Sequence, residues 1–403
     1  MVKAHSLLYA IYVCLLVSIL CGALLYFANL YNMLNQYYNL HEDLYIQNQS
    51  ALNYALSNGN TTQELLIPET GLTSSFEIKS HGLLSVAIVK SSLKGDTISS
   101  AHFIGHYPDT KMAIYLPSFS NPLTYSGNVK LIGDKRLPIK LIDGKNINNS
   151  VNKLTSSGIT ELSESVLPEI NPDFKSVAEA KAKKLVRLKD IERSNDSVYF
   201  NSFLNKTIEI ELTTSSIANV VIKGNFILYA KDSLTIKRDA VLQDVILKSP
   251  KIKIEEGFKG NLQVFASKKI EIGSNVNLCY PSVLLIYNNS LEKSEIKVNE
   301  NTIINGAVVI FGSPLTSIDD NVVIVKEKSL VIGDIYCSGK LMTNGKIYGS
   351  VYTNRFFSKI NLASYENCII NAEIDVSKRP DYFVSIPLFK NQKEAYGVFK
   401  KVL

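Results

Sequence analysis

The chain of 403 residues contains no tryptophan, and its five histidines all lie before residue 107. The rest of the sequence therefore lacks the side chain that most often acts as a general base. No Ser-His-Asp order, no phosphate-binding glycine-rich loop before a helix and no paired-cysteine metal motif is present. Sugar-binding clefts often use aromatic platforms, so the absence of tryptophan also counts against such a cleft, although 21 tyrosines remain. We predict that the protein is not an enzyme and has no cofactor and no catalytic, cofactor-binding or metal-binding residues.

Blocks of like charge are also missing, and the net charge is only +6. The densest basic run, residues 181–184, is interleaved with the acidic residues Glu179, Asp190 and Glu192. We interpret this run as a solvated helix face, with contact to anionic lipid or polymer as the alternative. The charge pattern predicts no nucleic-acid partner.

Cysteine is scarce and widely spaced. Cys14 and Cys21 lie inside an apolar segment, whereas Cys279, Cys337 and Cys368 lie far downstream. Three distant thiols form neither a disulfide framework nor a metal site. We expect them to be small buried residues, or else two of them form one disulfide and leave the third thiol free.

No Asp, Glu, Lys or Arg occurs between Lys3 and Glu42. As a helix rising about 1.5 Å per residue, the apolar residues 7–30 are long enough to cross a hydrocarbon core of about 30 Å. A cleavable signal peptide has a shorter apolar region, of about 7–15 residues. Lys3 precedes this span and acidic residues follow it, so the positive-inside rule places the N-terminus in the cytoplasm. We predict a single-pass membrane protein whose residues 7–30 contact the lipid bilayer, with the bulk of the chain extracytoplasmic (periplasmic in a Gram-negative cell).

The helix is predicted to continue beyond the membrane to about residue 58 as an amphipathic extension. Neither Pro nor Gly occurs between Leu30 and Gly59, and apolar residues recur every three or four positions with Asn48 as the polar exception. The predicted stripe consists of Leu30, Leu34, Tyr38, His41, Leu44, Asn48, Leu52 and Ala55.

A short basic start, an apolar helix and a direct amphipathic extension make residues 1–56 resemble the N-terminal stalk of type IV pilins and of type II secretion pseudopilins. That family is processed after a Gly that precedes an aromatic or hydrophobic residue, and it carries a Glu early in the helix. Here Ala4-His5-Ser6 stands at the corresponding place and no Glu follows. The resemblance implies a pilus-like or secretion-like assembly, and processing by a prepilin peptidase or a plain signal anchor are the two alternatives for the N-terminus.

Residues 60–170 are predicted to form a β-rich domain, because short apolar stretches alternate there with Gly, Pro, Ser and Asn. His102 and His106 are spaced as a helical metal pair would be, but they lie among strands, and we interpret them as surface histidines at strand ends. Residues 171–195 are predicted to form an amphipathic helix that begins at Asn171-Pro172-Asp173. We expect this helix to cover the open end of the next domain.

An internal repeat is the most specific signal of residues 205–354. Apolar-polar-apolar triplets recur at residues 234–236, 252–254 and 270–272, each followed by a turn of charged, Gly or Asn residues. A short strand cannot bury its apolar residues alone, so successive coils are expected to pair and to stack equivalent Ile and Val side chains. Asn, Gly and Asp suit the corners because they tolerate left-handed backbone angles. The pattern predicts a parallel β-helix, or β-solenoid, with a β-sandwich as the alternative.

By composition this stretch also resembles the β-helical core of bactofilins and related polymer-forming proteins, on the residues Gly333-Asp334-Ile335 and Gly345-Lys346-Ile347. Residues 355–403 leave the register and are predicted to form a C-terminal cap. The expected fold class is therefore mainly β: a parallel β-helix preceded by a β-rich region and a long N-terminal transmembrane helix.

β-Helices also carry polysaccharide lyases and glycosidases, whose sites gather several carboxylates, or a base with Arg or Lys, on one exposed face. The candidates here, Asp239, Glu255-Glu256 and Asp319-Asp320, lie at predicted corners where neighbouring side chains point apart. We favour a non-enzymatic cell-envelope protein with protein partners, a structural or assembly component of a pilus-like or secretion-like system. The alternative is a membrane-tethered enzyme or binding protein for cell-surface polysaccharide. A groove with three or more converging Asp, Glu, Arg or Lys side chains would favour that alternative.

Overall fold

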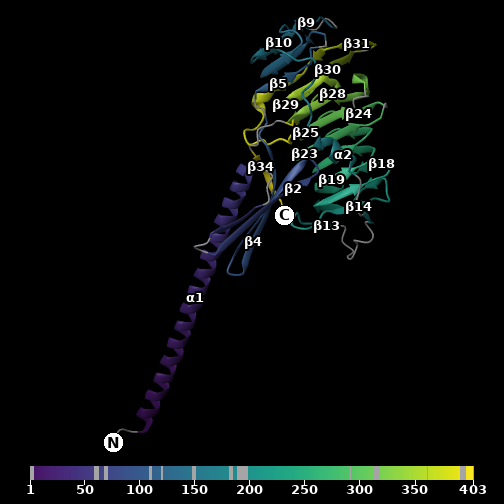
Figure 1. Ribbon diagram of the computed structural model, residues 1–403. Helices are drawn as coiled ribbons and strands as arrows, with labels where there is room; N and C mark the ends of the chain where they lie inside the picture. The colour runs from purple at the N-terminus through teal and green to yellow at the C-terminus, as the bar shows by residue number, and fades with distance from the viewer. Residues whose placement is uncertain are drawn as a thin grey trace. The chain divides into compact units, whose positions relative to one another are not determined.

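Figure 1 shows a computed structural model of the chain, in which one long helix is followed by many β-strands. The predicted mainly-β class with a long N-terminal helix is confirmed. Contacts divide the chain into two compact units, the first made of residues 1–55, 60–77 and 89–100 and the second of residues 56–59, 78–88 and 101–403. The structure describes residues 4–58, 63–67, 71–108, 111–118, 121–147, 151–180, 185–187, 198–290, 292–312, 317–360, 362–390 and 396–402.

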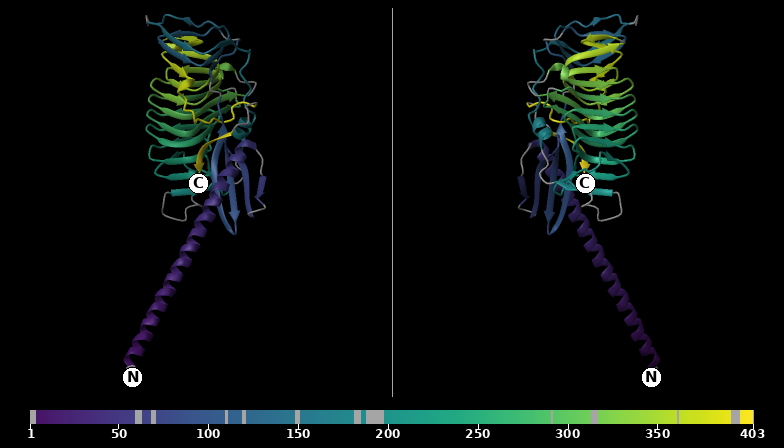
Figure 2. Two further views of the ribbon diagram at one scale, coloured as in Figure 1. Left: turned by 90° about the vertical axis from the view of Figure 1, so that its left-hand side faces the viewer. Right: turned by 90° about the vertical axis from the view of Figure 1, so that its right-hand side faces the viewer.

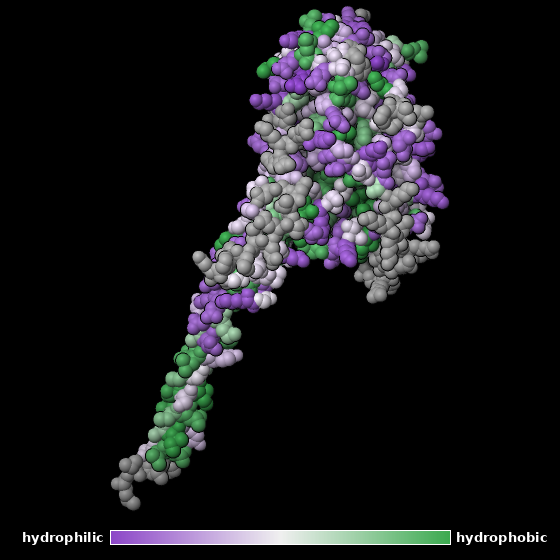
Figure 3. All heavy atoms as spheres, viewed as in Figure 1, coloured by the Kyte–Doolittle hydropathy of each residue, from purple (hydrophilic) through white to green (hydrophobic). Residues whose placement is uncertain are grey.

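α1 (Ala4–Asn58) runs without a break through the apolar segment and its extension. At about 1.5 Å per residue, its 55 residues extend for about 80 Å. Residues 6–39 are exposed around the whole helix, and Figure 3 shows mostly apolar side chains on the visible face of its N-terminal part. The hydroxyl of Ser18 donates a hydrogen bond to the carbonyl oxygen of Cys14 (2.8 Å), which satisfies it within the helix. α1 is thus long and apolar enough to cross a membrane.

The extension of α1 packs one face on strands of its own unit. β1 (Gln63–Ile67), β2 (Leu72–His81), β3 (Leu84–Leu93) and β4 (Asp96–His106) are hydrogen-bonded in this order, and the first unit contains their residues 63–77 and 89–100. Leu44 is buried in a cluster with Leu72 and Leu93. The predicted stripe is therefore covered over residues 44–55, whereas Leu34 and Tyr38 are exposed.

Asn48, the polar exception in the stripe, is fully buried and joins α1 to two strands. Its Oδ1 accepts a hydrogen bond from the hydroxyl of Ser100 (2.6 Å), and its Nδ2 donates to the carbonyl oxygen of Val89 (3.3 Å). A buried amide with a partner at each end specifies one position of the helix on the sheet.

We expect Asn48→Leu to loosen the attachment of α1. The variant leaves the Ser100 hydroxyl buried without its acceptor, which costs about 1–3 kcal/mol, whereas the double variant with Ser100→Ala removes both partners and should restore most of the loss. Hydrogen exchange of residues 44–55 and 89–100 in the full chain measures the local opening free energy. Ser50→Ala is the control, because the exposed Ser50 hydroxyl bonds only to the carbonyl oxygen of Ile46. Equal exchange in the single and double variants would contradict the role of Asn48.

The second unit contains three parallel ladders, each with strands stacked one above the next (Figure 2). Their strands belong to one 26-stranded sheet among the described residues. Ladder 1 consists of β15 (Ser216–Ile217), β18 (Ser233–Ile236), β20 (Lys251–Ile254), β22 (Lys269–Ile272), β24 (Ser294–Val298), β26 (Asn321–Val325) and the second half of β28 (Ile335–Thr343).

Ladder 2 contains β13 (Val198–Asn201), β16 (Val221–Gly224), the first halves of β19 (Val241–Lys248), β21 (Lys259–Ala266), β23 (Asn277–Asn288) and β25 (Ile303–Gly312), then β27 (Leu330–Ile332), β29 (Lys346–Tyr348), β33 (Glu373–Asp375), β7 (Asn128–Ile132) and β10 (Lys153–Ser157). Ladder 3 contains β12 (Leu185–Arg187), β14 (Ile208–Glu211), β17 (Phe226–Tyr229), the second halves of β19, β21, β23 and β25, the first halves of β28 and β30 (Val351–Ile360), then β5 (Met112–Tyr115), β8 (Asp134–Leu137) and β11 (Thr160–Leu162).

The remaining elements of this unit are short or lie outside the ladders. β6 (Thr124–Ser126), β9 (Asp143–Gly144) and β32 (Cys368–Ile370) form a small sheet, β31 (Ala363–Glu366) pairs with β30, and β34 (Tyr396–Val402) pairs with β4. Two 3₁₀ turns are η1 (Ile318–Asp320) and η2 (Val376–Lys378).

The predicted triplets pair in register. Ile236 lies beside Ile254, Ile254 beside Ile272, and Ile272 beside Val298, and all four side chains are fully buried (0% exposed). They belong to one apolar cluster, to which ladders 2 and 3 also contribute. Parallel pairing excludes the sandwich alternative, whose sheets are antiparallel.

The corners of the ladders carry the predicted left-handed residues. Gly257, Asn275 and Asn301 have φ angles of 76°, 57° and 56°, which these residue types adopt at low cost. Each follows a triplet strand, so the turn chemistry read from the sequence is confirmed at these three positions.

Ladder 3 is apolar on both faces, which explains continuous runs such as Val283–Ile286 in β23. Leu284 belongs to the inner cluster, whereas Leu285 packs in a second cluster on the other face. That second cluster also contains Leu84 of β3 and Phe103 of β4, from the parts of these strands that belong to the second unit. Parallel strands buried on both faces characteristically lack an alternating pattern.

The prediction of a helix over residues 171–195 that covers the end of the repeat is wrong, both in the length of the helix and in the surface that it covers. α2 (Asp173–Glu179) has seven residues, and β12 (Leu185–Arg187) pairs with β14, so bonding to the sheet prevails over the helical spacing of apolar residues. Phe174 packs in the second cluster, so α2 covers a face of ladder 3 and not the end of the sheet. The basic run 181–184 and residues 188–195 lie outside the described residues.

The predicted boundaries near residues 170 and 354 do not divide the sheet. β5, β7, β8, β10 and β11, from the predicted β-rich domain, continue ladders 2 and 3 beyond β30 and β33. β33 itself comes from the predicted C-terminal cap. Strand edges therefore join segments that are far apart in the sequence, which a local repeat pattern cannot reveal.

Candidate functional site

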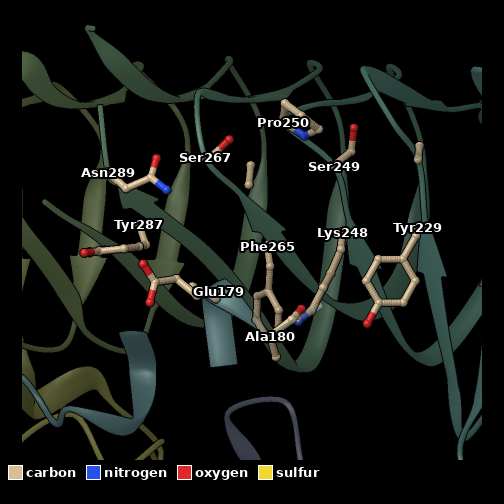
Figure 4. Close-up of a pocket in the computed structure, with 13 residues that line it drawn as sticks. Glu179, Ala180, Tyr229, Lys248, Ser249, Pro250, Phe265, Ser267, Tyr287 and Asn289 are labelled. Carbon is tan, nitrogen blue, oxygen red and sulfur yellow. Dashed lines mark hydrogen bonds between the residues drawn. The ribbon is translucent and has the colours of Figure 1, made fainter. Parts of the chain in front are cut away.

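A groove of about 470 Å³ lies on the face of ladder 3 that carries the second cluster, beside the C-terminal end of α2 (Figure 4). In register, Tyr229 lies beside Lys248 and Lys248 beside Phe265, so three successive strands supply neighbouring side chains to its floor. Strand neighbours stand about 4.8 Å apart, which brings these three side chains into contact range. The groove is lined by Ala178, Glu179, Ala180, Tyr229, Ala230, Lys248, Ser249, Pro250, Phe265, Ala266, Ser267, Tyr287 and Asn289.

Lys248 ties α2 to ladder 3. Its ammonium donates hydrogen bonds to the carbonyl oxygens of Val177 (2.8 Å) and Ala180 (3.2 Å), where the helix leaves its last carbonyls unpaired. The Nζ atom also lies 5.8 Å from the ring centre of Tyr229 and 5.6 Å from that of Phe265. Burial lowers the pKa of Lys248 to about 8, although the charge of Glu209 opposes the shift. The side chain therefore has a structural role that its sequence context did not indicate.

The groove combines aromatic surface with few charged groups. Burial raises the pKa of Tyr229 to about 12, with a smaller contribution from the charge of Glu209, so the phenol stays protonated at neutral pH. Among the described lining residues, Glu179 is the one carboxylate and Lys248 is occupied by the end of α2.

His102 and His106 are buried in β4, so the prediction of surface histidines is wrong. Pairing of β4 with β34, which places His102 beside Lys401, covers this part of the strand. Four positions along a strand separate the two side chains by about 13 Å, too far to share a metal ion. Burial lowers the pKa of His102, and the charge of Lys401 lowers it further. The described residues contain no group of three or more His, Cys, Asp or Glu that could hold a metal.

His81 is also buried and is uncharged at neutral pH. Burial lowers its pKa to about 4, although a hydrogen bond with the backbone of Asp244 opposes the shift. Its Nε2 lies 3.0 Å from the carbonyl oxygen of Asp244, and its ring packs against Phe103 and Phe203. Asp244 in turn pairs with Lys400 of β34 (2.6 Å). These contacts hold the start of the β2–β3 turn and the C-terminal strand on the parallel sheet of the same unit.

Four of the five corner carboxylates have a partner of their own. Asp319 pairs with Lys340 (2.6 Å), and Asp320 accepts a hydrogen bond from the amide of Ser317 (2.8 Å) in a capping box. The hydrogen bond from Lys340 holds the pKa of Asp319 below its ordinary value. In the other doublet, Glu255 pairs with Lys237 (2.6 Å). Further along the same corner, Glu256 accepts from the amide of Asn275 (2.9 Å), while Asp239 is exposed.

The three downstream cysteines are free thiols. Cys337 and Cys368 are buried, and Cys279 is half-buried. Burial raises the pKa of Cys337 to about 12, so its sulfur stays protonated and inert. The reading of these residues as small buried side chains thus fits two of the three.

Asp334 and Arg379 form a buried ion pair that no sequence pattern indicated. Arg379 Nη2 contacts Asp334 Oδ1, while Asp334 Oδ2 accepts a hydrogen bond from the hydroxyl of Ser385 (2.8 Å). The side chains are only 3% and 10% exposed for Arg379 and Asp334 respectively. Asp334 belongs to the repeat and Arg379 to the predicted cap, and no spacing rule connects two such segments.

No protein-family model matches the chain, and no curated protein matches it. Among solved structures, the chain is similar to the competence-associated pilin ComZ from Thermus thermophilus, with 10% sequence identity and a TM-score of 0.22. The match covers 85% of this chain and 86% of that one. A similarity at this TM-score carries no argument about the fold or the function of the chain.

Proposed function

We propose that the chain is a membrane-anchored cell-envelope protein that serves as a structural or assembly component of a pilus-like or secretion-like system. Residues 7–30 lie in the bilayer, the N-terminus faces the cytoplasm, and the remainder is exported, to the periplasm in a Gram-negative cell. The observation that carries this proposal is the continuity of α1. Its first part is apolar on all sides, and its last part is fixed to strands by Leu44 and Asn48.

The middle of α1 supports contact with other proteins. A span that begins at residue 7 leaves the hydrocarbon core after roughly 20–25 residues, so the side chains from residue 31 onward lie outside it. Seven large apolar or aromatic side chains nevertheless remain exposed between residues 31 and 46, and contiguous exposed apolar surface characteristically marks a protein interface. They are Tyr31, Met33, Leu34, Tyr37, Tyr38, Tyr45 and Ile46.

We also propose that ladders 1, 2 and 3 close into a three-sided β-solenoid. Inward side chains from each ladder, such as Ile254, Leu278 and Leu284, belong to one buried cluster. Left-handed residues lie between ladders 1 and 2, and the four long strands pass from ladder 2 directly into ladder 3. A stacked body of this kind is rigid along its axis and offers extended lateral surfaces for docking.

Site-specific photo-cross-linking tests the assembly role. A benzoyl-phenylalanine placed at Tyr38 of the membrane-embedded full chain should form adducts with the apolar helix of a second protein, identified by mass spectrometry of the cross-linked peptide. The same probe at Leu52, which is 4% exposed, is the matched control on the same helix and should cross-link only within the chain.

Adducts of Tyr38 with lipid alone would contradict the assembly role while leaving the anchor intact. The orientation has its own readout in the same membranes. Protease added to the outer side of spheroplasts should digest the residues that follow α1, and protection of those residues would reverse the proposed topology.

A further inference from the structure

A second groove, of about 450 Å³, crosses ladder 2 where β27, β29, β33, β7 and β10 succeed one another. Four lysines and one glutamate line it: Lys130, Lys153, Lys328, Lys346 and Glu373. Amide and hydroxyl side chains, including those of Asn128 and Thr155, occupy much of the remaining lining. The groove is thus rich in polar side chains and predominantly basic.

Strand register sets the spacing of these charges. Lys346 lies beside Glu373, Glu373 beside Lys130, and Lys130 beside Thr155, all on one side of the ladder. Lys153 lies on the same strand as Thr155, beside Asn128. Successive strands are about 4.8 Å apart, so Lys346 and Lys130, which have Glu373 between them, lie about 10 Å apart along the ladder, a distance comparable to two sugar units of a polysaccharide.

Part of this positive charge is neutralised within the chain. Lys130 pairs with Asp375 (2.6 Å), and Glu373 pairs with Lys378 (2.5 Å) and lies 3.9 Å from Lys346. Burial acts to raise the pKa of Glu373, but its hydrogen bond to Lys378 and the charges of Lys378 and Lys130 hold it below its ordinary value. Glu373 is therefore ionised at neutral pH and orients the lysines around it.

Lys153 and Lys328 provide the excess charge. Both side chains are exposed, and neither forms an ion pair or hydrogen bond with another described residue. Lys328 adopts a φ angle of 59°, which directs the chain through a tight corner at the edge of the groove. Two unneutralised cations in a concave, amide-rich surface are suited to an anionic ligand.

The lining favours a polysaccharide over a nucleic acid. Single-stranded nucleic acids stack their bases on aromatic side chains, and none of the described lining residues is aromatic. Asn128, Asn344 and Asn371 instead offer amides, which can donate to and accept from sugar hydroxyls.

We propose that this groove binds an anionic polysaccharide that carries carboxylates along its chain. Lys153 and Lys328 contact the carboxylates, and the neighbouring asparagines contact the hydroxyls.

Fluorescence anisotropy of a labelled polygalacturonate oligosaccharide, titrated with the full chain in detergent micelles, tests this site. The double variant Lys153→Gln, Lys328→Gln should weaken binding by about five- to tenfold, as expected for two exposed charge contacts. Lys251→Gln, Lys253→Gln on β20 is the matched control with the same change of net charge, also at exposed positions, and should bind as the unmodified chain does. Far-UV circular dichroism checks that both variants are folded.

Three results would overturn the proposal. These are no binding of polygalacturonate by the unmodified chain, equal weakening in the two double variants, or binding of single-stranded DNA as tight as that of polygalacturonate. The second would assign the effect to net charge, and the third to a general polyanion surface. Neutral dextran should not bind, and binding as tight as that of polygalacturonate would also exclude the role given to the lysines.

Discussion

Replacing Ile272 by aspartate should lower the stability of the second unit by about 4–5 kcal/mol or more. Ile272 is fully buried between Ile254 and Val298, in the cluster shared by all three ladders. A carboxylate at this position has no partner, so it must either remain charged in an apolar surrounding or take up a proton at a free-energy cost. Urea unfolding of the full chain in micelles, followed by hydrogen exchange of β20, β22 and β24, measures the loss.

Ile303→Asp is the matched control for this prediction. Ile303 begins β25 in ladder 2 but is 38% exposed, so the same chemical change should cost far less there. Ile272→Val, expected to cost about 0.5–1.5 kcal/mol, keeps the experiment informative should the aspartate variant fail to fold. If Ile272→Asp were no worse than Ile303→Asp, ladder 1 would not enclose a continuous apolar interior.

Asp334→Ala should destabilise the second unit by about 3–5 kcal/mol, because it leaves the guanidinium of Arg379 buried without its carboxylate. The hydroxyl of Ser385 and the amide of Ser350 also lose their acceptor, at 2.8 Å and 3.2 Å respectively. Thermal unfolding followed by far-UV circular dichroism detects the change in a chain that has no tryptophan to report it. Asp381→Ala, at an exposed position in the same segment as Arg379, should stay within about 0.5 kcal/mol of the unmodified chain.

A double-mutant cycle separates the ion pair from its surroundings. Removing both charges, as Asp334→Ala with Arg379→Met, should recover more than half of the loss, since two apolar side chains replace a desolvated pair. Purely additive losses in the double variant would show that Asp334 and Arg379 contribute independently.

The features that the sequence predicted well depend on neighbouring residues. The helix to residue 58 follows from uninterrupted helical spacing, and the register of Ile236, Ile254 and Ile272 follows from equal spacing of one triplet. Gly257 and Asn275 indicated the turns after two strands because Gly and Asn are the residue types that adopt a left-handed backbone conformation at low cost. Each of these features is specified by residues close to one another in the sequence.

The features that it did not predict depend on contacts between distant segments. In the sequence Asn48 only interrupts an apolar stripe, because its hydrogen-bond partners Ser100 and Val89 lie more than 40 positions away. The groove lined by Lys130, Lys153, Lys328 and Lys346 contains residues of three distant segments of the chain. Lys130, for example, lies 243 positions before its ladder neighbour Glu373. The spacing of Leu185 also fits one face of a helix. Its backbone instead pairs with β14, a later strand, and it therefore lies in β12.

The joining of β5 to β30 and of β7 to β33 has a consequence for the order of folding. β5 and β7 pair with β8 and β10 nearby in the sequence, but the other edge of each has no neighbour until residues 351–375 have been synthesised, since Tyr115 pairs with Tyr352 and Leu131 with Ile374. Closing so long a loop is slow, and the triplet strands between can assemble first from local contacts. A chain interrupted before residue 351 would therefore leave the edges of β5 and β7 unpaired, which makes completion of the C-terminal segment the step that commits the second unit to its native state.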